Sequence, residues 1–138
     1  MQIRELDLKE LYVTYELVSQ LREELSYQEF EDLIYDMRYM DYKMIGIMEK
    51  EQLVSYAGVA VQTNLYHKRH IFVFDFVTDK EFRGKGYGKM MLDYLKDYAK
   101  VAMCENIVLS SGFAREEAHA FYEKNGYDKK SFVFVKSL

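Results

Sequence analysis

The sequence predicts an α/β (α+β) domain in which a mixed central β-sheet is flanked by helices. One reason is that the hydrophobic period changes from helical spacing in residues 8–37 to strand-like runs in residues 43–78. Another is the order of the expected elements, β-α-α-β-β-β-α-β-α-β, because consecutive strands favour antiparallel pairing and strand–helix–strand units favour parallel pairing. Hydrophobic residues make up 49% of the 138, enough for one sizeable core, so we expect a single domain over 1–138.

The individual elements follow from local patterns. Helices are expected where apolar residues recur every three or four positions, and strands where β-branched and aromatic residues cluster. Ser26 stands three residues before Glu29, a capping-box pattern that begins a helix, and Gly126 is typical of a helix C-terminus. In order, we expect a strand at 2–6, a helix at 8–25, a helix after Ser26 that places Phe30, Leu33, Ile34 and Met37 on one face, strands at 43–48, 53–62 and 70–78, a helix at 89–103, a strand at 107–110, a helix at 114–125 and a strand at 131–135.

The composition excludes several classes of protein. Lys and Arg total 19 against 23 Asp and Glu, and the net charge of −4 argues against non-specific nucleic-acid binding. A lone cysteine, Cys104, excludes an internal disulfide, and the three histidines have no metal-ligand spacing. The N-terminus carries charges where a signal peptide needs an apolar core, and the apolar runs are too short to span a bilayer. We therefore expect a cytoplasmic protein with no membrane partner.

A glycine-rich segment, residues 83–89, follows the strand expected at 70–78 and precedes a helix. It reads Arg-Gly-Lys-Gly-Tyr-Gly-Lys and carries +3 with no acidic residue. Glycines let the backbone approach a ligand closely, and the N–H groups at a helix N-terminus bind anions, so the segment predicts a pyrophosphate site. Its G-x-G-x-G spacing does not fit the dinucleotide fingerprint, and Met90 stands where a P-loop has Ser or Thr. The alternative without a ligand is a plain tight turn.

Two motifs make the chain resemble the GCN5-related N-acetyltransferase (GNAT) family. Arg83-x-x-Gly86-x-Gly88 is similar to the family's acyl-CoA-binding motif. The end of the family's late helix is matched by Ala118, Tyr122, Gly126 and Tyr127. The resemblance covers nearly the whole chain and implies the GNAT fold, acetyl-CoA as the cofactor and N-acetylation of an amine. One departure is Lys80, which stands where relatives commonly have proline in the turn before the loop.

The resemblance implies a cofactor site along the strand end and the loop. Backbone amides of the loop would hold the pyrophosphate, and the strand end would pair its backbone with the pantetheine arm. Arg115 stands where many relatives have an asparagine that contacts the cofactor. The residues implied are Phe76, Val77, Thr78, Arg83, Gly84, Lys85, Gly86, Tyr87, Gly88, Lys89, Arg115 and Tyr122.

The resemblance also implies the reacting groups. Tyr122 occupies the family's general-acid position and would protonate the departing thiolate, although an ordinary core aromatic is the alternative. A backbone N–H near Val77 would stabilise the oxyanion. Asp75 is the only acidic residue in 71–78, and an acid in so apolar a strand suits a base for the attacking amine, although a solvated strand-end aspartate is the alternative. His119, three residues before Tyr122, would either reach it or remain a partly exposed helix residue.

The charge of the N-terminal region bears on the acceptor. Residues 1–41 hold eleven acidic and four basic residues, a balance of −7. The resemblance implies a small-molecule or peptide amine as the acceptor. In the family the first two helices border the acceptor site, so an acidic border there would favour a cationic acceptor. A solvated acidic face is the alternative. Two rival functions stay open: a non-catalytic acyl-CoA-binding module of the same fold, and a transferase for aminoacyl-tRNA, against which the net charge speaks. A homodimer is a further expectation from family habit.

Overall fold

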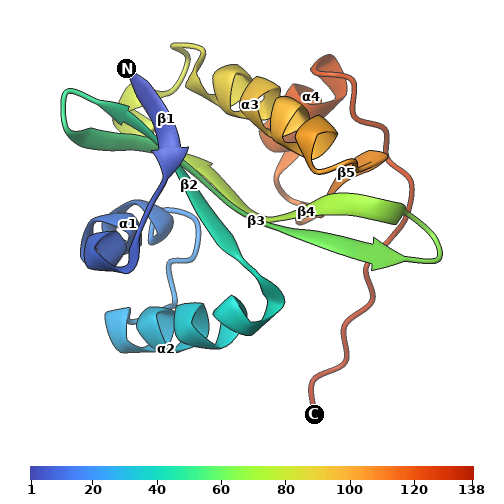
Figure 1. Ribbon diagram of the computed structural model, residues 1–138, viewed down its shortest axis with the longest axis horizontal. Coiled ribbons are helices and arrows are strands. Elements are labelled where there is room, and N and C mark those ends of the chain that lie inside the picture. Colours follow the sequence, from blue (N-terminus) through green and yellow to red (C-terminus); the bar gives the residue numbers. More distant parts are fainter. The chain divides into compact units, whose positions relative to one another are not determined.

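The structure, a computed structural model, describes residues 1–138. These residues form two compact units, Met1–Val108 and Leu109–Leu138. A mixed five-stranded sheet forms the centre of the first unit (Figure 1). The strands are β1 (Gln2–Glu5), β2 (Lys43–Glu49), β3 (Gln52–Asn64), β4 (Lys68–Thr78) and β5 (Asn106–Leu109). The helices are η1 (Leu8–Glu10), α1 (Leu11–Val18), α2 (Tyr27–Met37), η2 (Arg38–Met40), η3 (Lys80–Phe82), α3 (Tyr87–Val101) and, in the second unit, α4 (Glu116–Lys124). The predicted fold class is confirmed, and the single domain over 1–138 stays a prediction.

The order of strands in the sheet follows the order of the chain, β1-β2-β3-β4-β5. The first four strands pair antiparallel with their neighbours, as consecutive strands joined by short turns do. The four-residue β5 joins the sheet after α3 has crossed it, and the Glu105 N–H donates to the Arg69 carbonyl at 2.7 Å beside its start. Because Arg69 lies at the beginning of β4, β5 lies beside the first half of that strand.

Helices cover the sheet of the first unit from both sides, with α1 and α2 on one face and α3 on the other (Figure 1). Helix α2 begins at the predicted capping box: the Ser26 hydroxyl accepts from the Glu29 N–H, and the Glu29 carboxylate accepts from the Ser26 N–H. Phe30 and Ile34 of the predicted apolar face are buried, whereas Leu33 is 46% exposed. Leu33 is rotated about 100° from Ile34 around the helix and lies at the edge of the face that Phe30 and Ile34 bury.

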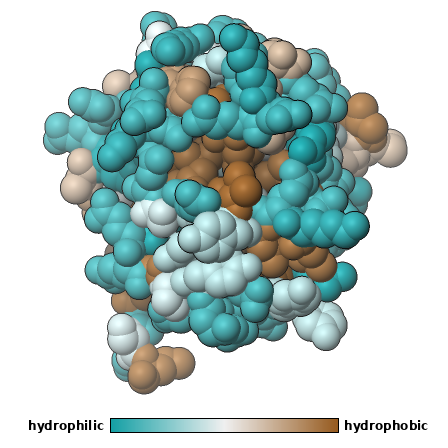
Figure 2. All heavy atoms as spheres, turned by 90° about the vertical axis from the view of Figure 1, so that its left-hand side faces the viewer, coloured by the Kyte–Doolittle hydropathy of each residue, from teal (hydrophilic) through white to brown (hydrophobic).

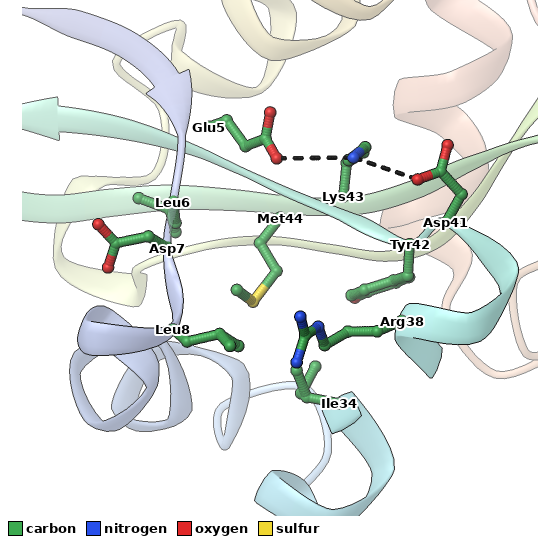
Figure 3. Close-up of a pocket in the computed structure, with 10 residues that line it drawn as sticks. All are labelled: Glu5, Leu6, Asp7, Leu8, Ile34, Arg38, Asp41, Tyr42, Lys43 and Met44. Carbon is green, nitrogen blue, oxygen red and sulfur yellow. Dashed lines mark ion pairs between the residues drawn. The ribbon is translucent and has the colours of Figure 1, made fainter. Parts of the chain in front are cut away.

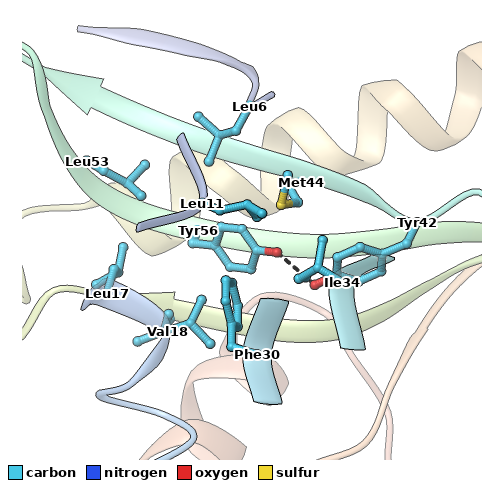
Figure 4. Packing of buried hydrophobic residues seen from close by; sticks show 11 residues of the cluster. Leu6, Leu11, Leu17, Val18, Phe30, Ile34, Tyr42, Met44, Leu53 and Tyr56 are labelled. Carbon is cyan, nitrogen blue, oxygen red and sulfur yellow. Dashed lines mark hydrogen bonds between the residues drawn. The ribbon is translucent and has the colours of Figure 1, made fainter. Parts of the chain in front are cut away.

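The main hydrophobic cluster lies between the sheet and the pair α1 and α2 (Figure 4). Its buried members are Leu6, Leu11, Leu17, Val18, Phe30, Ile34, Tyr42, Met44, Leu53, Tyr56 and Val77. Tyr42 and Tyr56 bring hydroxyl groups into this apolar layer and satisfy each other, with their oxygens 2.7 Å apart. On the opposite face, α3 buries Met91, Leu92, Leu95 and Ala99, as its apolar spacing predicts.

The helix expected at 8–25 is shorter than predicted, because α1 ends at Val18. The chain then turns through bonds from the Gln20 N–H to the Leu17 carbonyl (3.0 Å) and from the Leu21 N–H to the Val18 carbonyl (2.9 Å). Leu21 packs against the core from within this turn, so the apolar spacing continues after the helix has stopped. The connection that results, residues 19–26, carries Arg22 toward β4.

The strand expected at 131–135 is absent, and residues 127–138 contain no helix or strand. The apolar side chains of this segment, Phe132, Val133, Phe134 and Val135, are between 64% and 92% exposed. The prediction rested on their β-propensity, but β-propensity measures how well side chains fit a pleated sheet and needs a partner strand to take effect. No strand of the sheet pairs with this segment.

Helix α4 is the regular element of the second unit, and it ends as its sequence predicts. Gly126 adopts φ +90°, and its N–H donates to the Glu123 carbonyl at 3.1 Å. The Tyr127 N–H donates to the Tyr122 carbonyl at 3.0 Å, which completes a Schellman motif. The glycine is required here because the left-handed conformation disfavours a residue with a Cβ.

The surface that faces the viewer in Figure 2 is mostly hydrophilic, with apolar side chains visible toward its middle. None of the helices is long and apolar enough to cross a membrane.

Candidate functional site

The glycine-rich loop forms the junction between β4 and α3. Gly84 and Gly86 have φ of +76° and +90°, a region that residues with a Cβ rarely adopt. Gly86 is the N-cap of α3, and no side chain caps the helix. The N–H groups of the first helical turn therefore have no side-chain acceptor and are directed outward. A Cβ added at either glycine would meet nothing within 4 Å, so the space over the loop is open. The loop therefore has the donors, the dipole and the room to bind an anionic group.

The three cations of the loop have different neighbours. The Arg83 Nε donates to the Thr78 carbonyl at 3.0 Å and ties the loop to the end of β4. The Lys85 ammonium lies 5.1 Å from the centre of an aromatic ring, and the Lys89 Nζ lies 2.9 Å from the Asp93 carboxylate on the next turn of α3. Residues 83–89 carry a charge of +3 with no acidic residue, but helix α3 brings the Asp93 carboxylate next to Lys89 and partly neutralises its charge.

Tyr87 anchors the loop to a second strand. Its hydroxyl donates to the carboxylate of Glu49, at the end of β2, at 2.7 Å. The hydrogen bond lowers the pKa of Glu49 and raises the pKa of Tyr87, because it favours the carboxylate and the neutral phenol. The same carboxylate lies 3.5 Å from the N-terminal ammonium of Met1. The loop is thus held at β4 through Arg83 and at β2 through Tyr87.

A β-bulge in β4 lies at Phe74, nine positions before the loop begins at Arg83. Gly58 of β3 pairs with Asp75, but the next residue, Val59, pairs with Val73, so Phe74 is an extra residue in β4. A bulge of this kind kinks the strand and changes the direction of nearby side chains. After it, the predicted cofactor-binding stretch 76–78 continues the ladder with β3.

The bulge brings Asp75 into contact with two side chains from distant parts of the chain. Tyr42 donates its hydroxyl proton to Asp75 Oδ2 at 2.7 Å, and the Arg22 Nε donates to Oδ1 at 3.1 Å. The Arg22 Nη2 also donates to the Phe74 carbonyl at 2.9 Å. The Asp75 side chain is 16% exposed. Asp75 is therefore neither isolated among apolar neighbours nor a solvated strand-end residue, the two environments that the sequence suggests.

Tyr42 and Tyr56 extend this network into the core. Burial raises the pKa of both phenols, most strongly because a charged phenolate in the apolar layer would lose its hydration. Both phenols therefore stay protonated at neutral pH. They form a chain of polar groups that runs from Tyr56 through Tyr42 to the side chain of Asp75. Gly58 provides the space, because a Cβ at this position would overlap the Tyr42 hydroxyl.

A pocket of about 360 Å³ lies beside Tyr42, between β1, η1, α2 and the start of β2 (Figure 3). Its charged lining residues include Lys43, whose Nζ lies 3.1 Å from Asp41 and 4.0 Å from Glu5. The hydrogen bond with Asp41 raises the pKa of Lys43. The pocket is lined by Glu5, Leu6, Asp7, Leu8, Ile34, Arg38, Asp41, Tyr42, Lys43 and Met44.

The second unit holds Tyr122 and Arg115 on and next to α4. Tyr122 packs its ring against Phe121 and Tyr127, at centroid distances of 5.7 and 5.9 Å. Burial raises the pKa of Tyr122, and the Arg115 guanidinium opposes part of this rise. The His119 Nε2 lies 2.8 Å from the Gly112 carbonyl and must be the donor, because a carbonyl oxygen only accepts.

Within the first unit, the structure places the predicted residues 76–78 and 83–89 in one continuous segment that runs from β4 to α3. Sequence reasoning missed Arg22 and Tyr56. It considered Tyr42, with Tyr27, Tyr35 and Tyr39, as a residue that could line a pocket or simply pack, and Tyr42 does line the pocket, but its bond to Asp75 was missed. Arg22 could have been noticed as a lone cation in an acidic stretch, but nothing distinguishes Tyr56 among 13 tyrosines or indicates that Tyr42 meets Asp75. No group of three or more His, Cys, Asp or Glu side chains is placed to hold a metal ion.

Comparison with known proteins identifies the family. A family model described as the acetyltransferase (GNAT) family matches residues 5–127. The chain belongs to the GNAT family. This GNAT protein is 32% identical over 127 residues to the "Uncharacterized N-acetyltransferase YhdJ" of Bacillus subtilis (strain 168), covering 91% of this chain and 89% of that protein.

Further relatives of this GNAT chain are N-acetyltransferases by name. It is 28% identical to the aminoalkylphosphonate N-acetyltransferase of Salmonella typhimurium (strain LT2), over 86% of this chain and 78% of that protein. The crystal structure of an aminoglycoside N-acetyltransferase in complex with CoA shares the fold with a TM-score of 0.87 at 12% identity, covering 99% and 93% of the two chains. The family predicted from two motifs is confirmed, and the relatives support an N-acetyltransferase.

Proposed function

We propose that this GNAT protein transfers an acetyl group from acetyl-CoA directly to the amine of a small-molecule or peptide acceptor. The observation that carries the proposal is the junction of β4 and α3, where two left-handed glycines open onto an uncapped helix N-terminus. This junction directly follows the strand that holds Asp75. One segment thus offers an anion site and a carboxylate for proton transfer.

The loop fits the diphosphate of acetyl-CoA. Outward N–H groups at the start of α3 would donate to the phosphate oxygens, and the open space over Gly84 and Gly86 would admit them. Lys85 and Lys89 would add positive charge, Lys89 less so because it already pairs with Asp93. When bound, acetyl-CoA supplies a thioester carbonyl that an amine can attack.

Asp75 would take the proton of the attacking amine. Free alkyl amines are protonated at neutral pH and must lose a proton before the nitrogen can form the new bond to the carbonyl carbon. Tyr42 holds Asp75 Oδ2 in place, so the proton would be accepted by the carboxylate in a fixed orientation. A backbone N–H near Val77 would donate to the oxyanion.

Tyr122 would protonate the sulfur as the carbon–sulfur bond breaks. Its pKa, raised by burial, keeps the phenol protonated at neutral pH, which a proton donor requires. Arg115 would contact the cofactor from the start of α4, as the family pattern implies. With these assignments Asp75 takes the proton that the ammonium loses before attack, the nitrogen bonds to the carbonyl carbon, and the Tyr122 proton passes to sulfur as the carbon–sulfur bond breaks. The second proton that the nitrogen loses restores the Tyr122 phenol, and Asp75 releases its proton to solvent, so the transfer balances.

The acceptor proposed is an amine, with a cationic one favoured. A relative in sequence is an aminoalkylphosphonate N-acetyltransferase, whose name gives an acceptor with an amino group. The acidic balance of residues 1–41 agrees with a positively charged partner. The cytoplasmic location and a homodimer stay predictions from the sequence.

A thiol-release screen tests the proposal. Acetyl-CoA would be offered with alkyl amines, polyamines, aminoglycosides and lysine peptides, and turnover is expected with at least one of them. Tyr122→Phe should lower kcat at least about tenfold and leave CoA binding in place, since general acid catalysis contributes on the order of 10²–10⁴. Thermal stabilisation by CoA without turnover on any amine would favour the rival acyl-CoA-binding module.

The loop assignment needs its own variant. Gly86→Glu places a carboxylate at the expected diphosphate and should abolish CoA binding measured by calorimetry. Gly86→Ala is the matched control, because it carries the same backbone strain at φ +90° in the same open environment without the carboxylate. Retained CoA affinity in folded Gly86→Glu would refute the assignment.

A further inference from the structure

Arg22 makes a contact that the proposed chemistry does not explain. It lies in the connection between α1 and α2, 53 residues from Asp75, yet its Nε donates to Asp75 Oδ1 at 3.1 Å. Its Nη2 donates to the Phe74 carbonyl at 2.9 Å. Two oxygen acceptors therefore converge on one cationic side chain at the bulge of β4.

The remaining surroundings of Asp75 leave one oxygen for an outside group. Oδ2 is taken by the Tyr42 hydroxyl at 2.7 Å, and Tyr42 is itself held by Tyr56. The polar atoms that face outward are thus Oδ1 and the Phe74 carbonyl, and Arg22 occupies both. An acceptor amine that delivers its proton to Asp75 has to use the same Oδ1.

We propose that Arg22 occupies the position of the acceptor's ammonium group, so that a cationic amine binds by displacing the guanidinium. This inference rests on the proposed role of Asp75 in the transfer. A protonated amine carries the charge and the N–H donors needed to replace both bonds of Arg22, whereas an amine that is neutral at the working pH lacks the charge. Arg22 therefore selects for acceptors with a positive charge at the reacting nitrogen.

The setting of Arg22 allows this exchange. Its side chain is 46% exposed, and an ion pair so open to water is weak because solvent screens it. The Arg22 N–H donates to the Val18 carbonyl at 2.8 Å, so its backbone is fixed while the long side chain can swing away. Withdrawal of the guanidinium would leave the Asp75–Tyr42 bond in place.

Steady-state kinetics test the displacement. Arg22→Gln removes the competing charge and should lower the KM of a cationic amine, identified by the thiol-release screen, about three- to tenfold, with kcat changed less than KM. Arg22→Lys keeps a competing cation and should stay closer to the wild type. Lys96→Gln, an equal charge change on the exposed face of α3, should leave both constants unchanged. A raised KM in Arg22→Gln would overturn the inference, because it would mean that Arg22 binds the acceptor.

A binding measurement separates this inference from the proposed reaction. Methylguanidinium chloride, compared with sodium chloride at equal ionic strength, should raise the Tm of Arg22→Ala more than that of the wild type. The double variant Arg22→Ala/Asp75→Asn should lose this difference. Equal shifts in all three proteins would refute the shared position whatever the turnover. If the shifts follow the expectation but no amine is acetylated, the cation position stands and the proposed function fails.

Discussion

At Gly58, the absence of a side chain decides whether Tyr42 can reach Asp75. A Cβ here would overlap the Tyr42 hydroxyl and approach its ring, and the ring is buried. Gly58→Ala should therefore lower the free energy of unfolding by about 1–3 kcal/mol, the usual cost of overpacking a core. Urea denaturation measures the change.

Gly112→Ala is the control for this substitution. Gly112 is exposed, and a Cβ there would meet nothing within 4 Å. Its unfolding free energy should stay within about 0.5 kcal/mol of the wild type. A Gly58→Ala protein as stable as this control would show that Tyr42 can move aside without cost.

At the scale of single residues, the sequence predicts positions whose chemistry is local. Ser26 and Glu29 sit three apart and form the expected capping box, and Gly126 has the expected left-handed conformation. Tyr42 and Arg22 could not be predicted, because their roles depend on contacts across 33 and 53 residues of chain. Nothing in a local window specifies which tyrosine meets a given carboxylate.

At the scale of elements, the turn between β4 and α3 shows how the chain does without the proline of its relatives. Asp79 has φ −52° and ψ 132°, an extended conformation suited to a residue before proline, and its carboxylate accepts from the Glu81 N–H. Lys80 begins η3, a position where proline fits. The Lys80 N–H donates to the Gln20 side chain at 3.0 Å, a bond that proline would remove.

Lys80→Pro should therefore be tolerated. Proline lowers the conformational entropy of the unfolded chain and so stabilises the folded protein, while loss of the bond to Gln20 costs a comparable amount. The unfolding free energy should therefore change by less than about 1 kcal/mol. Chemical denaturation together with Gln20→Ala, which removes the bond alone, separates the two effects. Failure of Lys80→Pro to fold would mean that the turn needs a backbone that proline cannot adopt.

The elements that sequence patterns located poorly have a common cause. Helix α1 stops at Val18 although the apolar spacing continues, because Leu21 packs inward from a turn. The segment 131–135 has strong β-propensity but no partner strand. In both cases the hydrophobic pattern does not determine the backbone conformation, which depends on contacts with distant parts of the chain.

At the scale of the whole molecule, buried phenols link stability to alkaline pH. Burial raises the pKa of Tyr42 and Tyr56 above the value near 10 of an unfolded chain. The contribution of these two phenols to the free energy of unfolding is fully present below pH 10. Above pH 10 the unfolded chain releases protons that the folded protein retains, so stability falls as pH rises, by about 1.4 kcal/mol per pH unit for each such group.

Urea unfolding between pH 9 and pH 11.5 should show this fall. Tyr56→Phe removes one of the two buried phenols and should make the decline shallower, even if the protein is less stable overall. Tyr39→Phe, at a side chain that is 93% exposed, should decline as steeply as the wild type. Equal slopes in all three proteins would contradict the linkage to buried phenols.

The bulge at Phe74 has a consequence for how this strand can change length in evolution. A one-residue deletion elsewhere in β4 would shift one side of the ladder and turn its side chains to the opposite face. Deletion of Phe74 would preserve every β3–β4 pair, because Val73 and Asp75 already oppose adjacent residues of β3. The same deletion would remove the carbonyl oxygen that accepts from Arg22. Relatives whose β4 is one residue shorter at this point could thus keep the sheet while lacking this half of the Arg22 contact.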